Sequence, residues 1–303
     1  MPTETDAASS PPLLPTPRPT LRDLAVLCRL PAVFTAVADP IAGAAVALGG
    51  SEVRFGPVVS HLDAPILLAS LASGCLYLFG MVQNDLTDRE EDAAVGKRRP
   101  IPEGRVSVGA ATSFGRCLLA TGLLLAGCVA ILTDGFWTVG TAMLLAATIS
   151  LYNCVLKETI FGPLAMASCR TLNMLLGVAV VADAFAPFNM STWLSLGGYW
   201  VPVGLGLYVA GLTLFARDET GIPNPTYLAM GYVAALGGVV LIALGLWNLR
   251  ATFSAGLALT VVAITISVRC LAAIRSRRAK QIGPAIGWMI LMIIPIDSII
   301  VLA

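Results

Sequence analysis

The sequence predicts an all-α integral membrane protein in which nine transmembrane helices form one bundle. Of its 303 residues, 57% are hydrophobic and 12% are charged, and the mean hydropathy is +0.83. Soluble domains carry roughly 25% charged residues, so this chain folded in water would expose more apolar surface than they tolerate. Its apolar residues also fall into runs of about 20, the length that crosses a bilayer as a helix. With no basic stripe interleaved with aromatics, we expect no nucleic-acid partner.

These runs define the domain organisation. Residues 1–20 contain six prolines together with Ser and Thr, which predicts a disordered tail. No basic segment and cleavage site precede the first run, so no signal peptide is expected. Residues 21–303 form a single transmembrane domain, with predicted spans at 24–48, 63–83, 109–132, 136–156, 160–182, 194–216, 226–247, 251–273 and 282–302.

The distribution of Lys and Arg predicts the orientation of these spans. When the N-terminus is placed in the cytoplasm, 17 of the 19 basic residues fall in cytoplasmic segments or adjacent helix ends, and only Arg54 and Arg250 lie outside. Cytoplasmic loops of membrane proteins carry such an excess. Nine spans then place the C-terminus outside. In a bacterium the membrane would be the inner (plasma) membrane.

Charge is concentrated in the segment Gln83–Ser107, QNDLTDREEDAAVGKRRPIPEGRVS. Five of the 18 acidic residues fall within it before Lys97. The spacing of Asp85, Asp88 and Asp92 places their side chains within about 60° of one another on a helix. Aligned carboxylates repel one another unless a cation neutralises them, and oxygen ligands without His or Cys favour Mg²⁺.

The bases that follow, Arg98 and Arg99, could hold phosphate oxygens directly. This segment therefore predicts a site for a polyanion bridged by Mg²⁺. The alternative is a solvated loop between helices, an interpretation that we favour for Glu90 and Glu91, which point away from the aspartate stripe.

A second acidic segment, FARDET (Phe215–Thr220), follows the sixth predicted span. It lies four helices after the first, on the same predicted side of the membrane. This spacing indicates two four-helix halves plus a ninth helix, with the site at their interface.

Several other polar residues need an interpretation. Asp39 lies in mid-span, where a carboxylate is costly and usually functional; it either faces a cavity and contacts the acceptor or a cation, or is a hydrogen-bonded packing residue. Asp297 is interpreted as a packing residue, and Asp134 and Asp183 are assigned to outer loops. The lone His61 provides no His-based metal site. Seven cysteines without a CxxC pair are predicted to be small buried residues: 28, 75, 117, 128, 154, 169 and 270.

The pattern Asn84-Asp85-x-x-Asp88-x-x-x-Asp92 resembles the first aspartate motif of the UbiA family of intramembrane prenyltransferases. The segment KRRPIPEGRVS (97–107) is similar to the basic, proline-containing hinge of that family. Shorter matches are YNCVLK (152–157), CRTLN (169–173) and RLP (29–31). The resemblance implies a helical bundle around a central cavity, in which a prenyl diphosphate ionises with Mg²⁺ and its prenyl group passes to an aromatic or other lipophilic acceptor.

The same resemblance implies roles for individual residues. The ligands of Mg²⁺ and diphosphate would be Asn84, Asp85, Asp88 and Asp92, with Asp218 and Glu219 from the second acidic segment. The bases that contact the phosphates would be Arg29, Lys97, Arg98 and Lys157. Tyr152 would lie close to the reacting carbon, and Asp39, Arg170 and Asn173 are further candidates for binding substrate. Catalysis would depend on Asp85, Asp88, Tyr152 and Asp218.

The second acidic segment departs from the family pattern. The family usually has DxxxD, whereas Asp218 and Glu219 are adjacent and position 222 is Ile. Adjacent side chains on a helix point about 100° apart, so the second metal site is in question. A lipid or precursor carrier with the same fold is therefore the alternative function. A CDP-alcohol phosphotransferase would need Asp-Gly followed by Ala-Arg, and here Arg89-Glu90 follows Asp88.

Overall fold

The computed structural model describes residues 19–49, 62–185, 188–217, 224–276 and 279–303. These residues form helices joined by short connections, and none of them lies in a strand. The helices are α1 (Leu21–Leu27), η1 (Leu30–Ala32), α2 (Val33–Gly49), α3 (Asp63–Thr87), α4 (Arg89–Ala94), α5 (Val108–Thr133), α6 (Trp137–Leu151), η3 (Tyr152–Leu156), α7 (Gly162–Ala184), α8 (Met190–Ser195), α9 (Trp200–Ala216), α10 (Pro225–Asn248), α11 (Phe253–Ser276), α12 (Ala279–Leu291) and α13 (Ile293–Leu302).

The described residues include seven helical stretches that are long and apolar enough to cross a membrane. Two shorter apolar helices, Val33–Gly49 and Trp200–Ala216, lie at the first and sixth predicted spans. The all-helical, multi-pass character is therefore confirmed. The count of nine crossings and the division into two halves stay predictions, while Asp218, Glu219, His61 and most of the tail lie outside the described residues.

Two predicted spans are wrong as continuous helices. The span 24–48 is interrupted at Arg29, whose backbone is left-handed with φ 47°. The span 194–216 is divided between α8 and α9, with Gly197 at φ 75° between them. The predicted span 282–302 is confirmed as one helical stretch, Gln281–Leu302. A single turn residue, Met292, separates α12 from α13 within it, close to Pro295, which has no N–H to donate.

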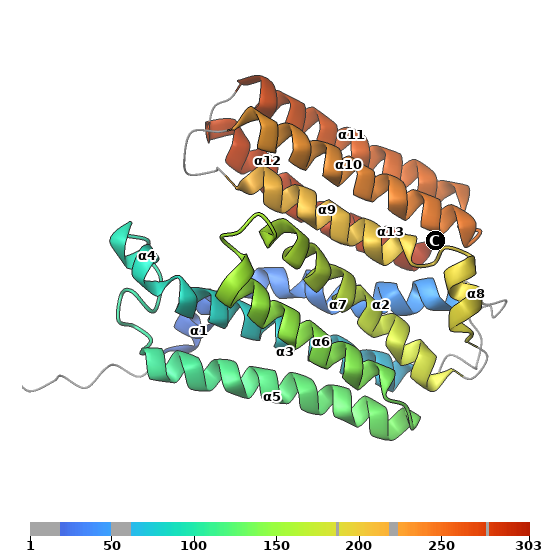
Figure 1. The fold of residues 1–303 in the computed structure, drawn as a ribbon, viewed down its shortest axis with the longest axis horizontal. Coiled ribbons are helices and arrows are strands. Elements are labelled where there is room, and N and C mark those ends of the chain that lie inside the picture. Colours follow the sequence, from blue (N-terminus) through green and yellow to red (C-terminus); the bar gives the residue numbers. More distant parts are fainter. Residues whose placement is uncertain (1–18, 50–61, 186–187, 218–223, 277–278) are drawn as a thin grey trace, which may run out of the picture.

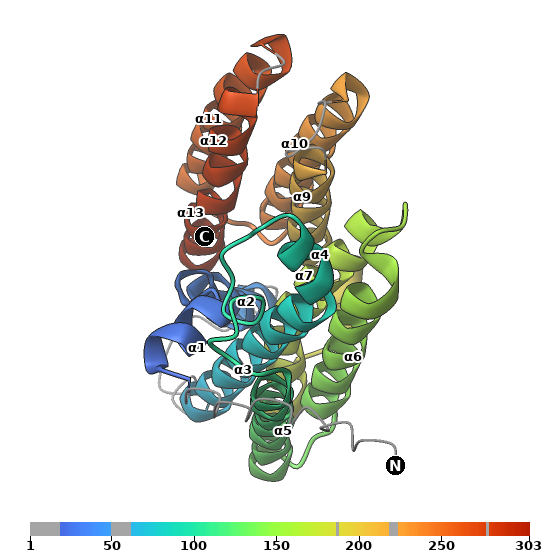
Figure 2. The same cartoon turned by 90° about the vertical axis from the view of Figure 1, so that its left-hand side faces the viewer.

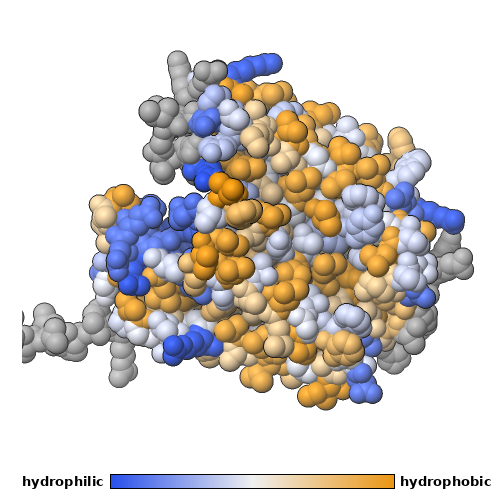
Figure 3. All heavy atoms as spheres, in the orientation of Figure 1, coloured by the Kyte–Doolittle hydropathy of each residue, from blue (hydrophilic) through white to orange (hydrophobic). Residues whose placement is uncertain are grey.

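The long helices run roughly along one axis of the molecule (Figure 1). The short helices α1 and α4 lie at one end of the bundle, whereas α8 and the C-terminus lie at the other. The C-terminal end of α9 lies at the same end as α4 (Figures 1 and 2). Apolar side chains cover most of the face in Figure 3, and hydrophilic residues gather near α4. Exposed apolar residues such as Leu124, Ile131 and Val268 suit contact with lipid.

Helices α2 and α7 approach each other at a pair of glycines. A Cβ on Gly177 would overlap the carbonyl oxygen of Pro40, and a Cβ on Gly43 would overlap the carbonyl oxygen of Met174. The backbones of the two helices therefore touch, as is common at helix contacts in membranes. This close packing positions Asp39, which α2 carries next to Pro40.

Gly177→Ala is expected to push α2 and α7 apart and to cost about 1–3 kcal/mol of stability, the usual effect of overpacking. Thermal unfolding of the purified protein in detergent measures this loss. Gly127→Ala on α5 is the matched control, because nothing lies within 4 Å of the Cβ that it adds. Equal unfolding midpoints for the two variants would contradict the close packing.

Two groups of minor predictions need correction. All seven cysteines are free, but the prediction that they are buried is wrong for Cys117, Cys128 and Cys154, which are exposed. Asp183 lies in the last turn of α7 rather than in a loop. Its carboxylate accepts hydrogen bonds from the Thr138 amide at 2.8 Å and hydroxyl at 2.7 Å, and so caps the start of α6.

Candidate functional site

The acidic segment forms a bent continuation of α3 at one end of the bundle. Helix α3 ends at Thr87, Asp88 occupies the junction, and α4 begins at Arg89. The amide of Asp88 still donates to the carbonyl of Asn84 at 3.0 Å, and the amide of Asp92 donates to the carbonyl of Asp88 at 2.8 Å. This helical pattern across the junction keeps Asp85 and Asp92 on one side of the chain.

Asp85 is the most enclosed carboxylate of this segment, with 1% of its side chain exposed. Its Oδ1 accepts from Nη2 of Arg29 at 3.2 Å and from Nη1 of Arg99 at 2.9 Å. Its Oδ2 is buried and has no hydrogen-bond partner among the described residues. The left-handed backbone at Arg29 directs this arginine to α3. One oxygen of Asp85 is therefore neutralised, and the other lacks a partner.

Asp92 joins Asp85 through the same arginine. Its carboxylate lies 2.7 Å from Nζ of Lys97 and 3.8 Å from Nε of Arg99. Of the two arginines that the charge pattern singled out, Arg99 therefore lies between the carboxylates, whereas Arg98 is exposed and forms no ion pair with the described residues. The resemblance had pointed to Arg98, and the geometry adds Arg99.

Asp88 turns toward a different element. Its Oδ2 pairs with Nζ of Lys157 and accepts from Nδ2 of Asn84 at 3.1 Å. Lys157 follows η3, a π-helical turn that begins at Tyr152, and Nδ2 of Asn153 anchors this turn to the carbonyl of Gly80 on α3 at 3.1 Å. The YNCVLK match thus forms one structural unit. Its turn brings the lysine to the aspartate motif and leaves Tyr152 half-buried beside it.

The segment after α4 is also tied to α1. Arg105 pairs with Asp23 of α1 and with Glu103, the latter at 2.7 Å. Hydrogen bonds from Thr20, with a smaller contribution from Arg105, hold the pKa of Asp23 below its usual range. Glycines with positive φ, Gly96 and Gly104, allow the chain to turn between these contacts. The bases of the site are therefore held on a segment anchored on both sides.

The remaining substrate-binding candidates gather in a second polar cluster among the helices. Arg170 on α7 lies 3.0 Å from the Asp39 carboxylate and 3.7 Å from that of Asp297. Nδ2 of Asn173 donates to Asp39 at 2.6 Å, and the hydroxyl of Ser73 donates to the Asn173 side chain at 2.5 Å. The mid-span carboxylate Asp39 is thus paired and hydrogen-bonded. Asp297, which was interpreted as a packing residue, lies in the same cluster.

The aspartate segment fits a hard divalent cation. Among the described residues no three acidic, His or Cys side chains converge as a ready metal site, and the three aspartates are paired with bases. The buried Oδ2 of Asp85 nevertheless lacks the partner that a buried oxygen normally has. Asp85, Asp88 and Asp92 supply carboxylate oxygens, the ligands with which proteins hold Mg²⁺, which takes its remaining ligands from water and phosphate.

Comparison with known proteins relates the chain to one family. The UbiA prenyltransferase family profile matches residues 40–290. Protoheme IX farnesyltransferase 2 of Cenarchaeum symbiosum is 28% identical over 234 residues, which cover 72% of this chain and 69% of that protein. Digeranylgeranylglyceryl phosphate synthase of Metallosphaera sedula is 30% identical over 160 residues, 52% of this chain and half of that protein's length.

Solved structures have a similar fold. The apo structure of a UbiA homologue from Aeropyrum pernix K1 has a TM-score of 0.65 at 17% identity, covering 88% of this chain and 96% of that one. A UbiA homologue from Archaeoglobus fulgidus, bound to GPP and Mg²⁺, has a TM-score of 0.52 at 16% identity, covering 92% and 99%. At these identities the likeness shows the fold alone.

Proposed function

The chain belongs to the UbiA prenyltransferase family, and on this premise we propose that it transfers a prenyl group from a prenyl diphosphate to a lipophilic acceptor. The observation that carries the proposal is the environment of Asp85, which is buried between Arg29 and Arg99 with one oxygen unpartnered. The prenyl diphosphate and Mg²⁺ bound by the Archaeoglobus fulgidus homologue support the same chemistry for this chain.

The residues of this chain have distinct tasks in that reaction. Asp85, Asp88 and Asp92 would hold Mg²⁺, which neutralises the charge that develops on the leaving diphosphate. Arg29, Arg99, Lys97 and Lys157 are the bases paired with these carboxylates. A diphosphate that arrives here meets cationic groups already held at the carboxylates, so little reorganisation accompanies ionisation.

The apolar helices would serve the other half of the substrate. An allylic cation survives only where water is kept away from it, and the aspartate segment lies at the end of a bundle of apolar helices. Tyr152, which begins the η3 turn that precedes Lys157, is the aromatic residue that we assign to the reacting carbon. Asp218 and Glu219 are assigned to the second side of the diphosphate site.

We place the N-terminus and the aspartate segment in the cytoplasm. This follows the distribution of Lys and Arg. The described chain begins beside α1 and ends at the opposite end of the bundle (Figure 1), as an odd number of crossings requires. A reporter fused after Ala303 tests the orientation, and its appearance in the cytoplasm would contradict it.

Turnover decides between a transferase and a carrier. Purified protein with Mg²⁺, radiolabelled geranyl diphosphate and a panel of phenolic, hydroxyl and amine acceptors should release diphosphate and form a labelled lipophilic product. Intact prenyl diphosphate that binds but is never cleaved, across all acceptors and prenyl lengths, would favour the carrier instead.

Arg99→Ala is expected to weaken prenyl diphosphate binding roughly tenfold or more, because hydrogen bonds to charged groups contribute about 1.5–3 kcal/mol. Arg89→Ala is the matched control and should stay within about twofold, since Arg89 is exposed and its ion pair is with the exposed Glu90. Equilibrium binding of radiolabelled geranyl diphosphate measures both. An effect of Arg89→Ala as large as that of Arg99→Ala would show that the segment acts only through its total charge.

A further inference from the structure

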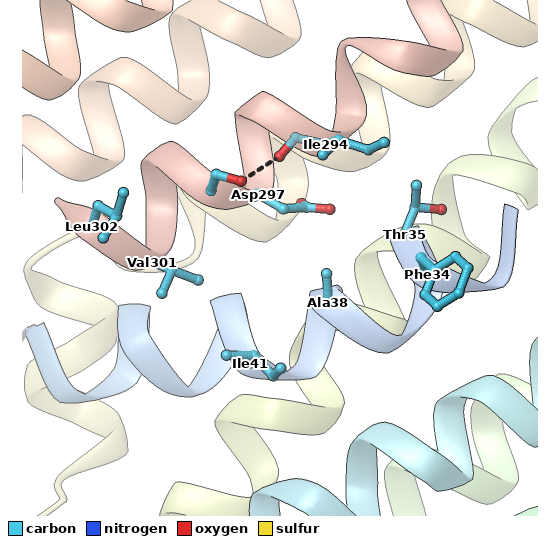
Figure 4. A pocket seen from close by; sticks show the side chains of 9 residues that line it. Phe34, Thr35, Ala38, Ile41, Ile294, Asp297, Val301 and Leu302 are labelled. Atoms are coloured by element: carbon cyan, nitrogen blue, oxygen red, sulfur yellow. Dashed lines mark hydrogen bonds between the residues drawn. The ribbon is translucent and has the colours of Figure 1, made fainter. Parts of the chain in front are cut away.

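A pocket of about 380 Å³ lies between α2 and α13, apart from the aspartate segment (Figure 4). Phe34, Thr35 and Ala38 line it from α2, and Ile294 and Asp297 line it from α13. Most of the lining is apolar, as in pockets that hold lipophilic small molecules. Asp297 is the charged residue in this lining.

Asp297 lacks the contacts that a buried carboxylate normally has. Its residue is 2% exposed, and neither carboxylate oxygen has a hydrogen-bond partner among the described residues. Figure 4 shows the side chain pointing from α13 toward α2 and the pocket. A carboxylate without hydrogen-bond partners in a membrane interior is costly, and such a residue is by default a candidate functional position.

The nearby arginine does not satisfy Asp297. Nη2 of Arg170 lies 3.0 Å from Asp39 and 3.1 Å from the carbonyl oxygen of Thr35, and Nη1 lies 3.3 Å from the Thr35 hydroxyl. The distance from Nη2 to Asp297 is 3.7 Å, too long for a hydrogen bond. Two carboxyl groups thus share one guanidinium, whose Nη1 and Nη2 contact Thr35 and Asp39, while its buried Nε has no hydrogen-bond partner among the described residues.

We propose that this pocket binds the polar head of the lipophilic acceptor, and that the head is a hydroxyl or amine that donates a hydrogen bond to Asp297. A negatively charged head would be repelled by the carboxyl groups of Asp39 and Asp297, which outnumber the one arginine beside them. The identification of this ligand as the acceptor rests on the proposed function. The support for that step is α2 itself, because it carries the pocket residues Thr35 and Ala38 and directly follows the segment with Arg29, the partner of Asp85.

Photolabelling with four matched probes tests the head-group chemistry. The probes are dodecylamine, dodecanol, dodecyl methyl ether and dodecanoic acid, each with a diazirine on the same carbon. The full chain in lipid nanodiscs, without Mg²⁺ or prenyl diphosphate, is irradiated, and labelled peptides of α2 and α13 are quantified by mass spectrometry. We expect the amine or the alcohol, or both, to label these helices about tenfold more than the ether, and the acid no more than the ether.

Two variants check that the label reports this pocket. Asp297→Asn should lower labelling by the amine about tenfold, and Ala38→Phe, which leaves every charge in place, should fill the pocket and lower labelling by all probes. Asp63→Asn, at the exposed start of α3, should change nothing. The Ala38→Phe result stands even if Asp297→Asn fails to fold.

The proposal is overturned if the ether or the acid labels as strongly as both donors, or if Ala38→Phe leaves labelling unchanged. Because binding is read without diphosphate, a failure of prenyl transfer would leave this result intact. Conversely, if the turnover assay succeeds while the probes show no preference, the proposal for this pocket fails and the proposed prenyl transfer stands.

Discussion

Asp85→Asn is expected to lower the rate of prenyl transfer at least about 100-fold. The substitution keeps the shape of the side chain and removes the charge that holds Mg²⁺, and a metal ion contributes several kcal/mol of charge stabilisation in such reactions. Asp85 is buried between two arginines, so no neighbouring solvent-exposed carboxylate can replace it easily. Diphosphate release under saturating geranyl diphosphate and Mg²⁺ measures the effect.

Glu90→Gln is the matched control for this prediction. Glu90 lies in the same acidic segment, but its side chain is 84% exposed and pairs only with the adjacent Arg89 among the described residues. Its rate should stay within about twofold of the wild type, since exposed ion pairs contribute little. A loss of rate in Glu90→Gln equal to that in Asp85→Asn would mean that only the total negative charge matters.

Arg170→Met is expected to destabilise the protein by about 3–5 kcal/mol, the usual cost of removing one partner of a buried ion pair. The variant leaves Asp39 and Asp297, both nearly inaccessible, without their shared cation. It also removes the hydrogen bonds to Thr35. Thermal unfolding of the purified protein in detergent measures the loss, and poor recovery of folded protein is the extreme form of the same result.

A rescue experiment separates lost charge pairing from lost packing. Adding Asp39→Asn and Asp297→Asn to Arg170→Met removes the two carboxyl groups and should recover part of the stability. Arg116→Met, at an exposed arginine of α5, should shift the unfolding midpoint little. A triple variant less stable than Arg170→Met alone would show that the arginine acts through its packing.

The acidic end of α3 could be predicted because its geometry is local. Asp85 and Asp92 are seven residues apart, so helical periodicity alone places them on one side, and the bases follow within the same segment. The pairing of Asp88 with Lys157 could be anticipated only through the resemblance. The sequence does not say that a π-helical turn carries the lysine there.

The contacts that span long stretches of chain were not predictable. Arg29 reaches Asp85 because the backbone of Arg29 is left-handed. Gly and Asn are the residues that usually adopt this conformation, so an arginine at this position does not predict it. The cluster of Arg170, Asp39 and Asp297 forms only when α2, α7 and α13 pack together. The break near Gly197 was missed because hydropathy averaged over about 20 residues hides interruptions of a few residues.

The most direct test of the magnesium-bridged diphosphate is the binding of geranyl thiolodiphosphate, an analogue with sulfur in place of the bridging oxygen, which binds without ionising readily. We predict that EDTA lowers its affinity at least about tenfold relative to Mg²⁺, and that this difference disappears in Asp85→Asn. Equal affinity with and without divalent ions, or an undiminished Mg²⁺ effect in Asp85→Asn, would contradict the role assigned to the aspartate segment.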